Sequence, residues 1–170
     1  FVVSNGSPAK FTVTLKVRDN LGVTDQKTLT ISINNTPPHV DITSPPNNFL
    51  YPLTEETVIP LQAMVSDSEH SNEQLTYAWQ TILHHQSHQH PEPIDSSPET
   101  TTNISPLGCQ GETYFYRITL TVSDASGAST TKEVRIYPDC ENIEKIPPVI
   151  TWPPPSPILE GAALSSTQLN

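Results

Sequence analysis

Residues 11–22 read FTVTLKVRDNLG, and residues 116–127 read YRITLTVSDASG. The two segments align without a gap at an offset of 105 residues, position 11 onto position 116. Each copy alternates apolar and polar residues, which is the pattern of a strand with one buried face. The Asp and Gly that follow favour a tight turn, because Asp bonds nearby backbone and Gly accepts a positive φ. Each copy therefore predicts a β-hairpin, and the offset matches a whole β-sandwich domain of about 100 residues.

The residues between the hairpins predict further strands. Alternating segments surround Val40, Leu61 and Trp79, and we expect Trp79 to lie in the core. No segment has the 3.6-residue period of an amphipathic helix. Residues 86–108, rich in Pro, Ser, Thr and His, predict a long loop or an edge excursion. The fold class that follows is all-β, an Ig-like antiparallel β-sandwich.

A proline pair follows each hairpin, at 37–38 and at 147–148. Such a pair suits a semi-rigid linker, although two ordinary loops would also accommodate it. As linkers, the pairs predict one complete domain flanked by partial ones. Residues 1–36 would be the C-terminal hairpin of a preceding domain, 37–140 the complete sandwich, 141–148 a Pro-rich linker and 149–170 the start of another domain.

Composition excludes several classes of function. The 170 residues carry 18 acidic and 8 basic side chains, a net charge of −10, so no basic stripe exists to bind nucleic acid. No stretch approaches the roughly 20 apolar residues of a membrane-spanning helix. The phosphate-binding, dinucleotide-binding and hydrolase motifs are absent from the sequence, so we do not expect an enzyme.

The two cysteines, Cys109 and Cys140, flank the second hairpin. Antiparallel register brings them together at its open end, within reach of a disulfide. Such a bond would stabilise the fold by about 3–4 kcal/mol and would indicate an oxidising, extracellular location. The alternative is two unrelated buried thiols.

Four of the six histidines lie close together, at His84, His85, His88 and His90. On one continuous strand, His84, His88 and His90 would share a face, with His85 on the other. Three imidazoles on one face could hold Zn or Cu, with a fourth position for water or Glu92. Histidines that only shape the backbone, or a solvated His-rich loop, remain alternatives.

A second cluster is acidic. Asp67, Glu69 and Glu73 lie within one short segment, and carboxylate oxygens are the ligands that Ca²⁺ prefers. The spacing is not that of an EF-hand, so a solvated turn is the competing interpretation.

Two segments carry a family resemblance. Residues 75–79, LTYAW, and residues 111–124, GETYFYRITLTVSD, resemble the polycystic-kidney-disease (PKD) type of Ig-like domain found in secreted bacterial proteins. The PKD family usually follows its tryptophan with a Phe-Gly-Asp-Gly turn, whereas QTILHH follows Trp79 here. The variant is similar to modules attached to glucose/sorbosone-type dehydrogenases, and residues 150–170 resemble the start of a bacterial Ig-like repeat.

These observations predict a non-catalytic, extracellular module that serves as a spacer, an adhesive or a substrate-presenting domain of a larger secreted or cell-surface protein, with a carbohydrate-active protein as one candidate. Its expected partners are neighbouring domains of the same polypeptide, and a polysaccharide or a cell-surface partner is a further candidate. Two alternatives stay open. One is a metal-binding domain that uses the histidines, and the other is self-association by strand exchange in an extracellular fibre.

Overall fold

The computed structural model describes residues 6–109, 111–141, 160, 161 and 163. Strands dominate these residues, and their one helix is the three-residue 3₁₀ helix η1 (Asn72–Gln74). The predicted all-β fold is confirmed. The division into domains stays a prediction, and most of its last segment, 149–170, lies outside the described residues.

The chain begins its described part with a two-stranded antiparallel sheet of β1 (Ala9–Arg18) and β2 (Thr24–Ile33). The turn between the strands depends on Asp19. Its Oδ1 accepts the backbone N–H groups of Leu21 and Val23, each at 2.9 Å. Gly22 adopts a φ of 91° there, which its missing side chain permits.

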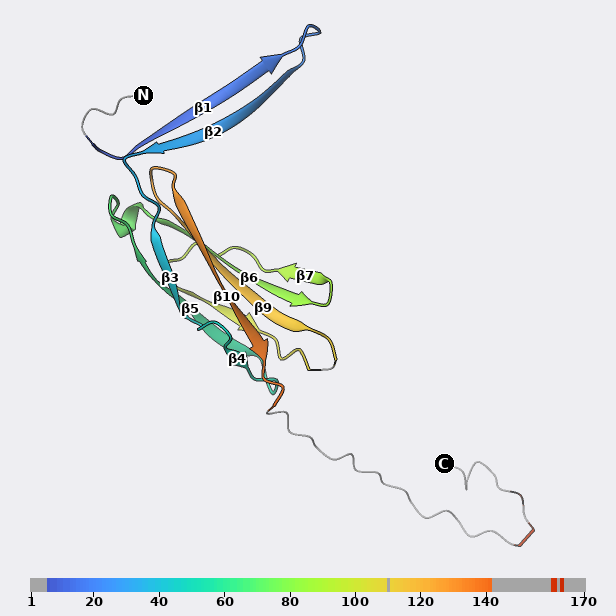
Figure 1. Ribbon diagram of the computed structural model, residues 1–170. Helices are drawn as coiled ribbons and strands as arrows, with labels where there is room; N and C mark the ends of the chain where they lie inside the picture. Colours follow the sequence, from blue (N-terminus) through green and yellow to red (C-terminus); the bar gives the residue numbers. More distant parts are fainter. Residues whose placement is uncertain (1–5, 110, 142–159, 162, 164–170) are drawn as a thin grey trace.

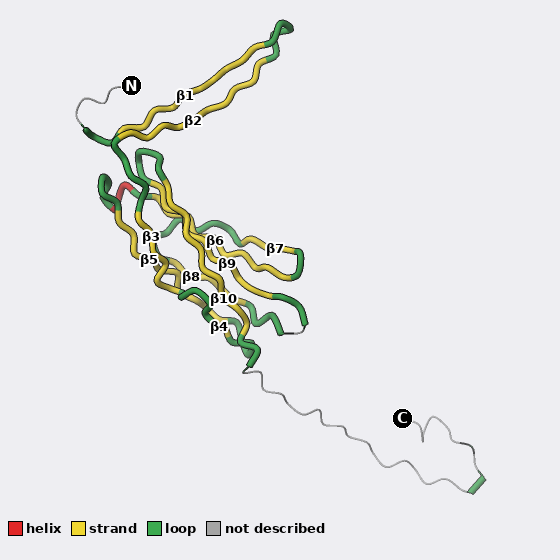
Figure 2. The backbone as a smooth tube through the Cα atoms, in the orientation of Figure 1, coloured by secondary structure: helices red, strands yellow, loops and turns green. Residues whose placement is uncertain are grey.

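The remaining eight strands form two sheets that pack face to face (Figures 1 and 2). The five-stranded sheet has the order β4-β10-β9-β6-β7, and the three-stranded sheet the order β3-β5-β8. Neighbours are antiparallel except β4 and β10, which are parallel. The strands are β3 (His39–Ser44), β4 (Leu50–Tyr51), β5 (Thr57–Ser66), β6 (Thr76–His85), β7 (His88–Pro91), β8 (Thr100–Ile104), β9 (Tyr114–Ser123) and β10 (Ser129–Pro138).

Alternate residues of the strands fill the core between the two sheets. Along β9, every second side chain is buried, as the period-2 pattern predicts. Trp79 is 1% exposed, and its indole N–H donates to the carbonyl oxygen of Pro98 at 3.3 Å. Trp79 is therefore the core residue that the sequence predicts. The whole arrangement is compatible with an Ig-like sandwich.

The internal repeat has the same geometry in both copies. Phe11 pairs with Ile31 in the first hairpin, and Tyr116 pairs with Ile136 in the second, again at the offset of 105. Asp124 occupies the position of Asp19 and accepts a backbone N–H in the same turn. The sequence repeat is thus a structural repeat, with β1–β2 equivalent to β9–β10.

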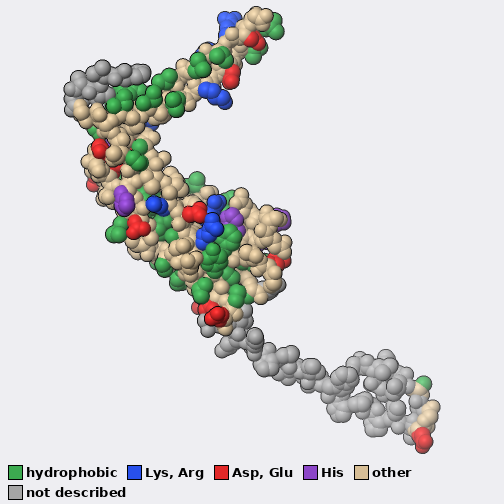
Figure 3. Space-filling view, viewed as in Figure 1, with side chains coloured by type: hydrophobic (Ala, Val, Ile, Leu, Met, Phe, Trp, Pro, Cys, Tyr) green, Lys and Arg blue, Asp and Glu red, His purple; other side chains and the backbone are tan. Residues whose placement is uncertain are grey.

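The two hairpins differ in what covers them. Leu120 on β9 is 0% exposed, whereas Leu15, at the equivalent position of β1, is 65% exposed. Val13, Val17 and Leu29 are also exposed, and Figure 3 shows hydrophobic side chains along the surface of this hairpin. The first hairpin therefore carries an apolar face without the second sheet that covers its counterpart.

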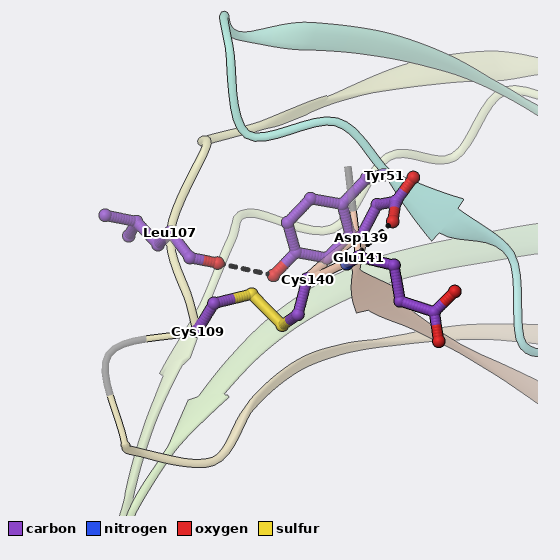
Figure 4. Close-up of a disulfide and its surroundings, with 6 residues drawn as sticks. All are labelled: Tyr51, Leu107, Cys109, Asp139, Cys140 and Glu141. Atoms are coloured by element: carbon purple, nitrogen blue, oxygen red, sulfur yellow. Dashed lines mark hydrogen bonds between the residues drawn. A yellow bond between two sulfur atoms is a disulfide. The ribbon is translucent and has the colours of Figure 1, made fainter. Parts of the chain in front are cut away.

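The predicted disulfide is confirmed. Cys109 and Cys140 are bonded, with their Cα atoms 5.5 Å apart. Figure 4 shows the bond beside Tyr51, whose hydroxyl donates to the carbonyl oxygen of Leu107 at 2.8 Å. The disulfide joins the segment before β9 to the chain just after β10, and the hydrogen bond joins the same segment to β4.

Residues 86–108 follow the second of the two predicted alternatives, an edge excursion, rather than a long loop. They contain β7 and β8, which are edge strands of the two sheets. The excursion begins at Gln86, whose φ of 48° lets the chain reverse after β6 and pair with it again. This reversal decides how the histidines are grouped.

Candidate functional site

Two clusters of chemically active side chains lie apart on the sandwich. The histidine cluster comprises His84, His85, His88 and His90 on the β6–β7 hairpin. The junction cluster comprises Asn35, Asp67, His70 and Asp124, where the chain leaves β2 and meets loops of the sandwich.

The β6–β7 turn groups the histidines differently from the expectation for one continuous strand. Because Gln86 and Ser87 form a two-residue turn, His85 lies opposite His88, and His90 lies opposite Leu83. His85, His88 and His90 therefore share one face, on which the rings of His88 and His90 stack against His85 at 5.5 and 5.2 Å. The predicted grouping of His84 with His88 and His90 is not what the structure contains.

The closest approach within this face joins two imidazole nitrogens. Nε2 of His85 and Nε2 of His90 are 3.1 Å apart. The other ring nitrogen of His85 is buried and has no hydrogen-bond partner within the described ranges. Tyr114 stacks on the same ring at 5.4 Å. Imidazole nitrogens are common ligands of Zn and Cu, so this pair has the chemistry to bind such an ion.

His84 lies on the opposite face of the sheet. Its ring stacks on Phe115 at 4.5 Å, and the guanidinium of Arg135 lies 5.5 Å from the same aromatic ring. Burial lowers the pKa of His84, and the positive charges of Arg117 and Arg135 lower it further. These surroundings therefore favour the neutral form of the His84 side chain.

The junction cluster brings together residues from three separate segments. Asp67 follows β5, Asp124 lies in the β9–β10 turn, and Asn35 follows β2. Nδ2 of Asn35 donates to Oδ2 of Asp124 at 2.8 Å. Nearby, Oγ of Ser32 donates to the carbonyl oxygen of Ser126 at 3.1 Å. The first hairpin is thereby linked to the sandwich by side-chain hydrogen bonds.

Among the described residues, one group of three His, Cys, Asp or Glu side chains has a ligand atom of each within 4.8 Å of the others. Its members are Asp67, His70 and Asp124. Burial raises the pKa of the Asp67 carboxyl, but hydrogen bonds from the Glu69 amide and from His70 outweigh that effect. The pKa of Asp67 therefore lies below the ordinary aspartate value.

Of the three acidic residues singled out in the sequence, only Asp67 belongs to this group. Both the amide and the hydroxyl of Thr36 donate to Oε2 of Glu69, at 3.0 and 2.8 Å. Glu73 lies exposed on η1. The sequence thus indicates an acidic segment. In the folded chain, only Asp67 of that segment joins the group, and its second carboxylate is Asp124 from a distant turn.

Sequence reasoning missed Asn35, His70 and Asp124 as members of a site. Asp124 occupies the same turn position as Asp19, so the sequence repeat identifies it only as a turn residue. Its hydrogen bond with Asn35 has no signal in the repeat. Contact between two loops of the sandwich brings His70 and Asp124 together, and the docking of the linker adds Asn35.

We compared the chain with protein-family models, with curated proteins and with solved structures, and found no match. Among the described residues, no helix has the length or apolar character to cross a membrane.

Proposed function

We propose that the chain is a non-catalytic spacer module of an extracellular protein in which PKD-type Ig-like sandwiches follow one another. The observation that carries this proposal is the pair of equivalent hairpins. They share register and turn, but Leu120 is buried in one and Leu15 is exposed in the other. An exposed apolar strand face of this kind favours a covering partner, since soluble monomers rarely leave such surfaces open. The hairpin β1–β2 would be the closing hairpin of a preceding sandwich.

The path of the chain supports an end-to-end arrangement. In Figure 1, β3 begins beside the first hairpin and β10 ends at the opposite end of the sandwich. Modules connected in this way extend along one axis. The disulfide between Cys109 and Cys140 supports an oxidising compartment, where such bonds persist.

Hydrogen exchange tests the proposal. The gene product should be prepared both as the present 170 residues and with about 70 further residues upstream, the length needed to complete a sandwich of about 100 residues. We expect the amides of β1 and β2 to exchange much more slowly in the longer chain, while those of β9 are protected in both. Unchanged exchange in β1–β2 would refute the proposal. Concentration-dependent sedimentation of the 170-residue chain would show that a second copy covers the face instead.

The 3.1 Å contact between the Nε2 atoms of His85 and His90 favours a second candidate function, transition-metal binding. Zinc and copper should be titrated calorimetrically into untagged protein and into His85→Ala and His90→Ala variants. The matched control is His84→Ala, because His84 lies on the opposite face of the same strand. Equal binding by all four proteins would exclude the site.

A further inference from the structure

The junction cluster contains a carboxylate that the protein leaves incompletely satisfied. The side chain of Asp67 is 0% exposed. Its Oδ1 accepts hydrogen bonds from the backbone N–H groups of Glu69 and His70, at 2.9 and 2.8 Å. Its Oδ2 is buried and has no hydrogen-bond partner among the described residues. A buried charged oxygen without a partner costs free energy, so a native structure normally supplies one.

A second carboxylate lies beside it. Asp124 is 7% exposed, and one of its oxygens lies within 4.8 Å of a ligand oxygen of Asp67. Even a protonated His70 would leave this buried group with a net negative charge, because two carboxylates face one imidazolium. Like charges at this separation repel strongly when water is excluded. A bound cation would remove the repulsion.

The free ligand atoms are oxygens. Both ring nitrogens of His70 are engaged, Nδ1 with Oδ1 of Asp67 and Nε2 with Oγ of Ser126, each at 3.0 Å. By contrast, Oδ2 of Asp67 and Oδ1 of Asn35 are both buried, and neither has a hydrogen-bond partner in the part of the chain that the structure describes. Carboxylate and amide oxygens are the ligands of hard divalent cations, Ca²⁺ above all.

We infer that Asp67, Asp124 and Asn35 form a Ca²⁺ site at the junction between the first hairpin and the sandwich. Asp67 and Asp124 come from loops of the sandwich, and Asn35 comes from the linker that follows β2. The ion would therefore hold the hairpin in a fixed orientation as well as neutralise the two carboxylates. The functional importance of a fixed hairpin orientation rests on the proposed role of the chain as a spacer module. The binding of Ca²⁺ does not depend on that role.

The first experiment measures binding. The 170-residue chain, freed of metal with a chelator, is titrated with CaCl₂ by calorimetry. We expect one ion per chain, with a dissociation constant of roughly 10⁻⁴–10⁻³ M, as in other extracellular modules. Asp67→Asn and Asp124→Asn should each weaken binding at least tenfold. Absence of Ca²⁺ binding by the unaltered chain at about 10 mM would overturn the inference.

The repeat offers a matched control for these variants. Asp19 occupies the turn position equivalent to Asp124 but lies at the exposed tip of the first hairpin. Asp19→Asn should leave Ca²⁺ affinity unchanged. The folding of Asp67→Asn is judged by Trp79 emission in chelator, in a Trp152→Phe background. If that variant fails to fold, Asn35→Ala provides the test, because it changes a linker residue and should weaken binding several-fold. Unaltered affinity in Asn35→Ala or Asp124→Asn would overturn the assignment.

The identity of the metal is tested separately. Zn²⁺ is titrated into the unaltered chain and into His70→Gln. Tighter binding of Zn²⁺ than of Ca²⁺, abolished by His70→Gln, would overturn the assignment of an oxygen-ligated site. Zn²⁺ binding that persists in His70→Gln but is lost in His85→Ala belongs to the histidine cluster and, with Ca²⁺ binding intact, supports two separate sites.

A third experiment tests orientation. Spin labels on Thr28→Cys in β2 and Gln62→Cys in β5, both exposed, report the distance between hairpin and sandwich. We expect Ca²⁺ to narrow the distance distribution, and Asn35→Ala to abolish the narrowing. An unchanged distribution with Ca²⁺ bound would overturn the orienting role. The outcome of hydrogen exchange in the longer chain, which tests the spacer function, affects none of these measurements.

Discussion

The equivalent leucines of the two hairpins allow a direct test of how the repeat is used. Leu120 lies at the centre of β9, pairs with Trp79 on β6 and is 0% exposed. Truncation of a buried leucine to alanine removes its transfer free energy and leaves a cavity, which together cost about 3–5 kcal/mol. Leu15 is 65% exposed, so the same truncation should change stability by about 0.5 kcal/mol or less.

Equilibrium unfolding in urea, followed by the emission of Trp79, measures both effects. Trp152 lies outside the described residues and would add its own signal, so the measurements use a Trp152→Phe background. With a slope of about 1.5 kcal/mol per molar urea, a loss of 3 kcal/mol lowers the midpoint by about 2 M. Leu15→Ala should leave the midpoint within about 0.3 M of the parent, by the same conversion.

Two results would contradict this reasoning. Equal shifts for Leu120→Ala and Leu15→Ala would mean that the first hairpin is packed in solution, by the sandwich or by another copy. A shift below about 0.5 M for Leu120→Ala would mean that β9 is not the centre of the cooperative core.

Three further predictions concern the disulfide and two titrating groups. Replacing both Cys109 and Cys140 with alanine should lower the unfolding free energy by about 3–4 kcal/mol, because the bond closes a loop across 31 positions; an unchanged melting temperature would show that the strand pairing alone constrains this loop. The pKa of Asp67 is lowered by folding, so its contribution to stability is complete above the ordinary aspartate value near 4 and is lost as pH falls through the lower folded value. Asp67→Asn should therefore reduce the loss of melting temperature as pH falls below about 4, and a slope equal to that of the parent would refute the lowered pKa. Burial lowers the pKa of His84, so stability should fall as pH drops below about 6.5, and His84→Phe should abolish that part of the decline while keeping the stack on Phe115.

Local patterns predicted the elements that depend on neighbouring residues in the chain. Alternation fixed which face of β9 is buried, since successive side chains of a strand point to opposite sides. The offset of 105 residues predicted two hairpins with the same turn, and the register of both agrees. The pairing of Cys109 with Cys140 followed from the same register, because the open end of a hairpin brings its flanks together.

The grouping of the histidines was wrong for a specific physical reason. One residue with a positive φ, Gln86, converts a continuous strand into a hairpin. Odd positions before a two-residue turn then lie opposite even positions after it, so His85 joins His88 and His84 is excluded. The periodicity of the sequence does not distinguish a continuous strand from a hairpin here, because the residues on both sides of the turn are extended in either case.

By itself the sequence determined an all-β chain, its repeated hairpins, its disulfide and its buried tryptophan, since each depends on alternation or on pairing across a turn. The tertiary structure alone decided whether the apolar face of each hairpin is covered and which carboxylates meet. Asn35, Asp67 and Asp124 are far apart along the chain. They become neighbours because two loops of the sandwich contact each other and the segment after β2 docks onto them. Such contacts depend on how separate elements pack, which local sequence patterns do not determine.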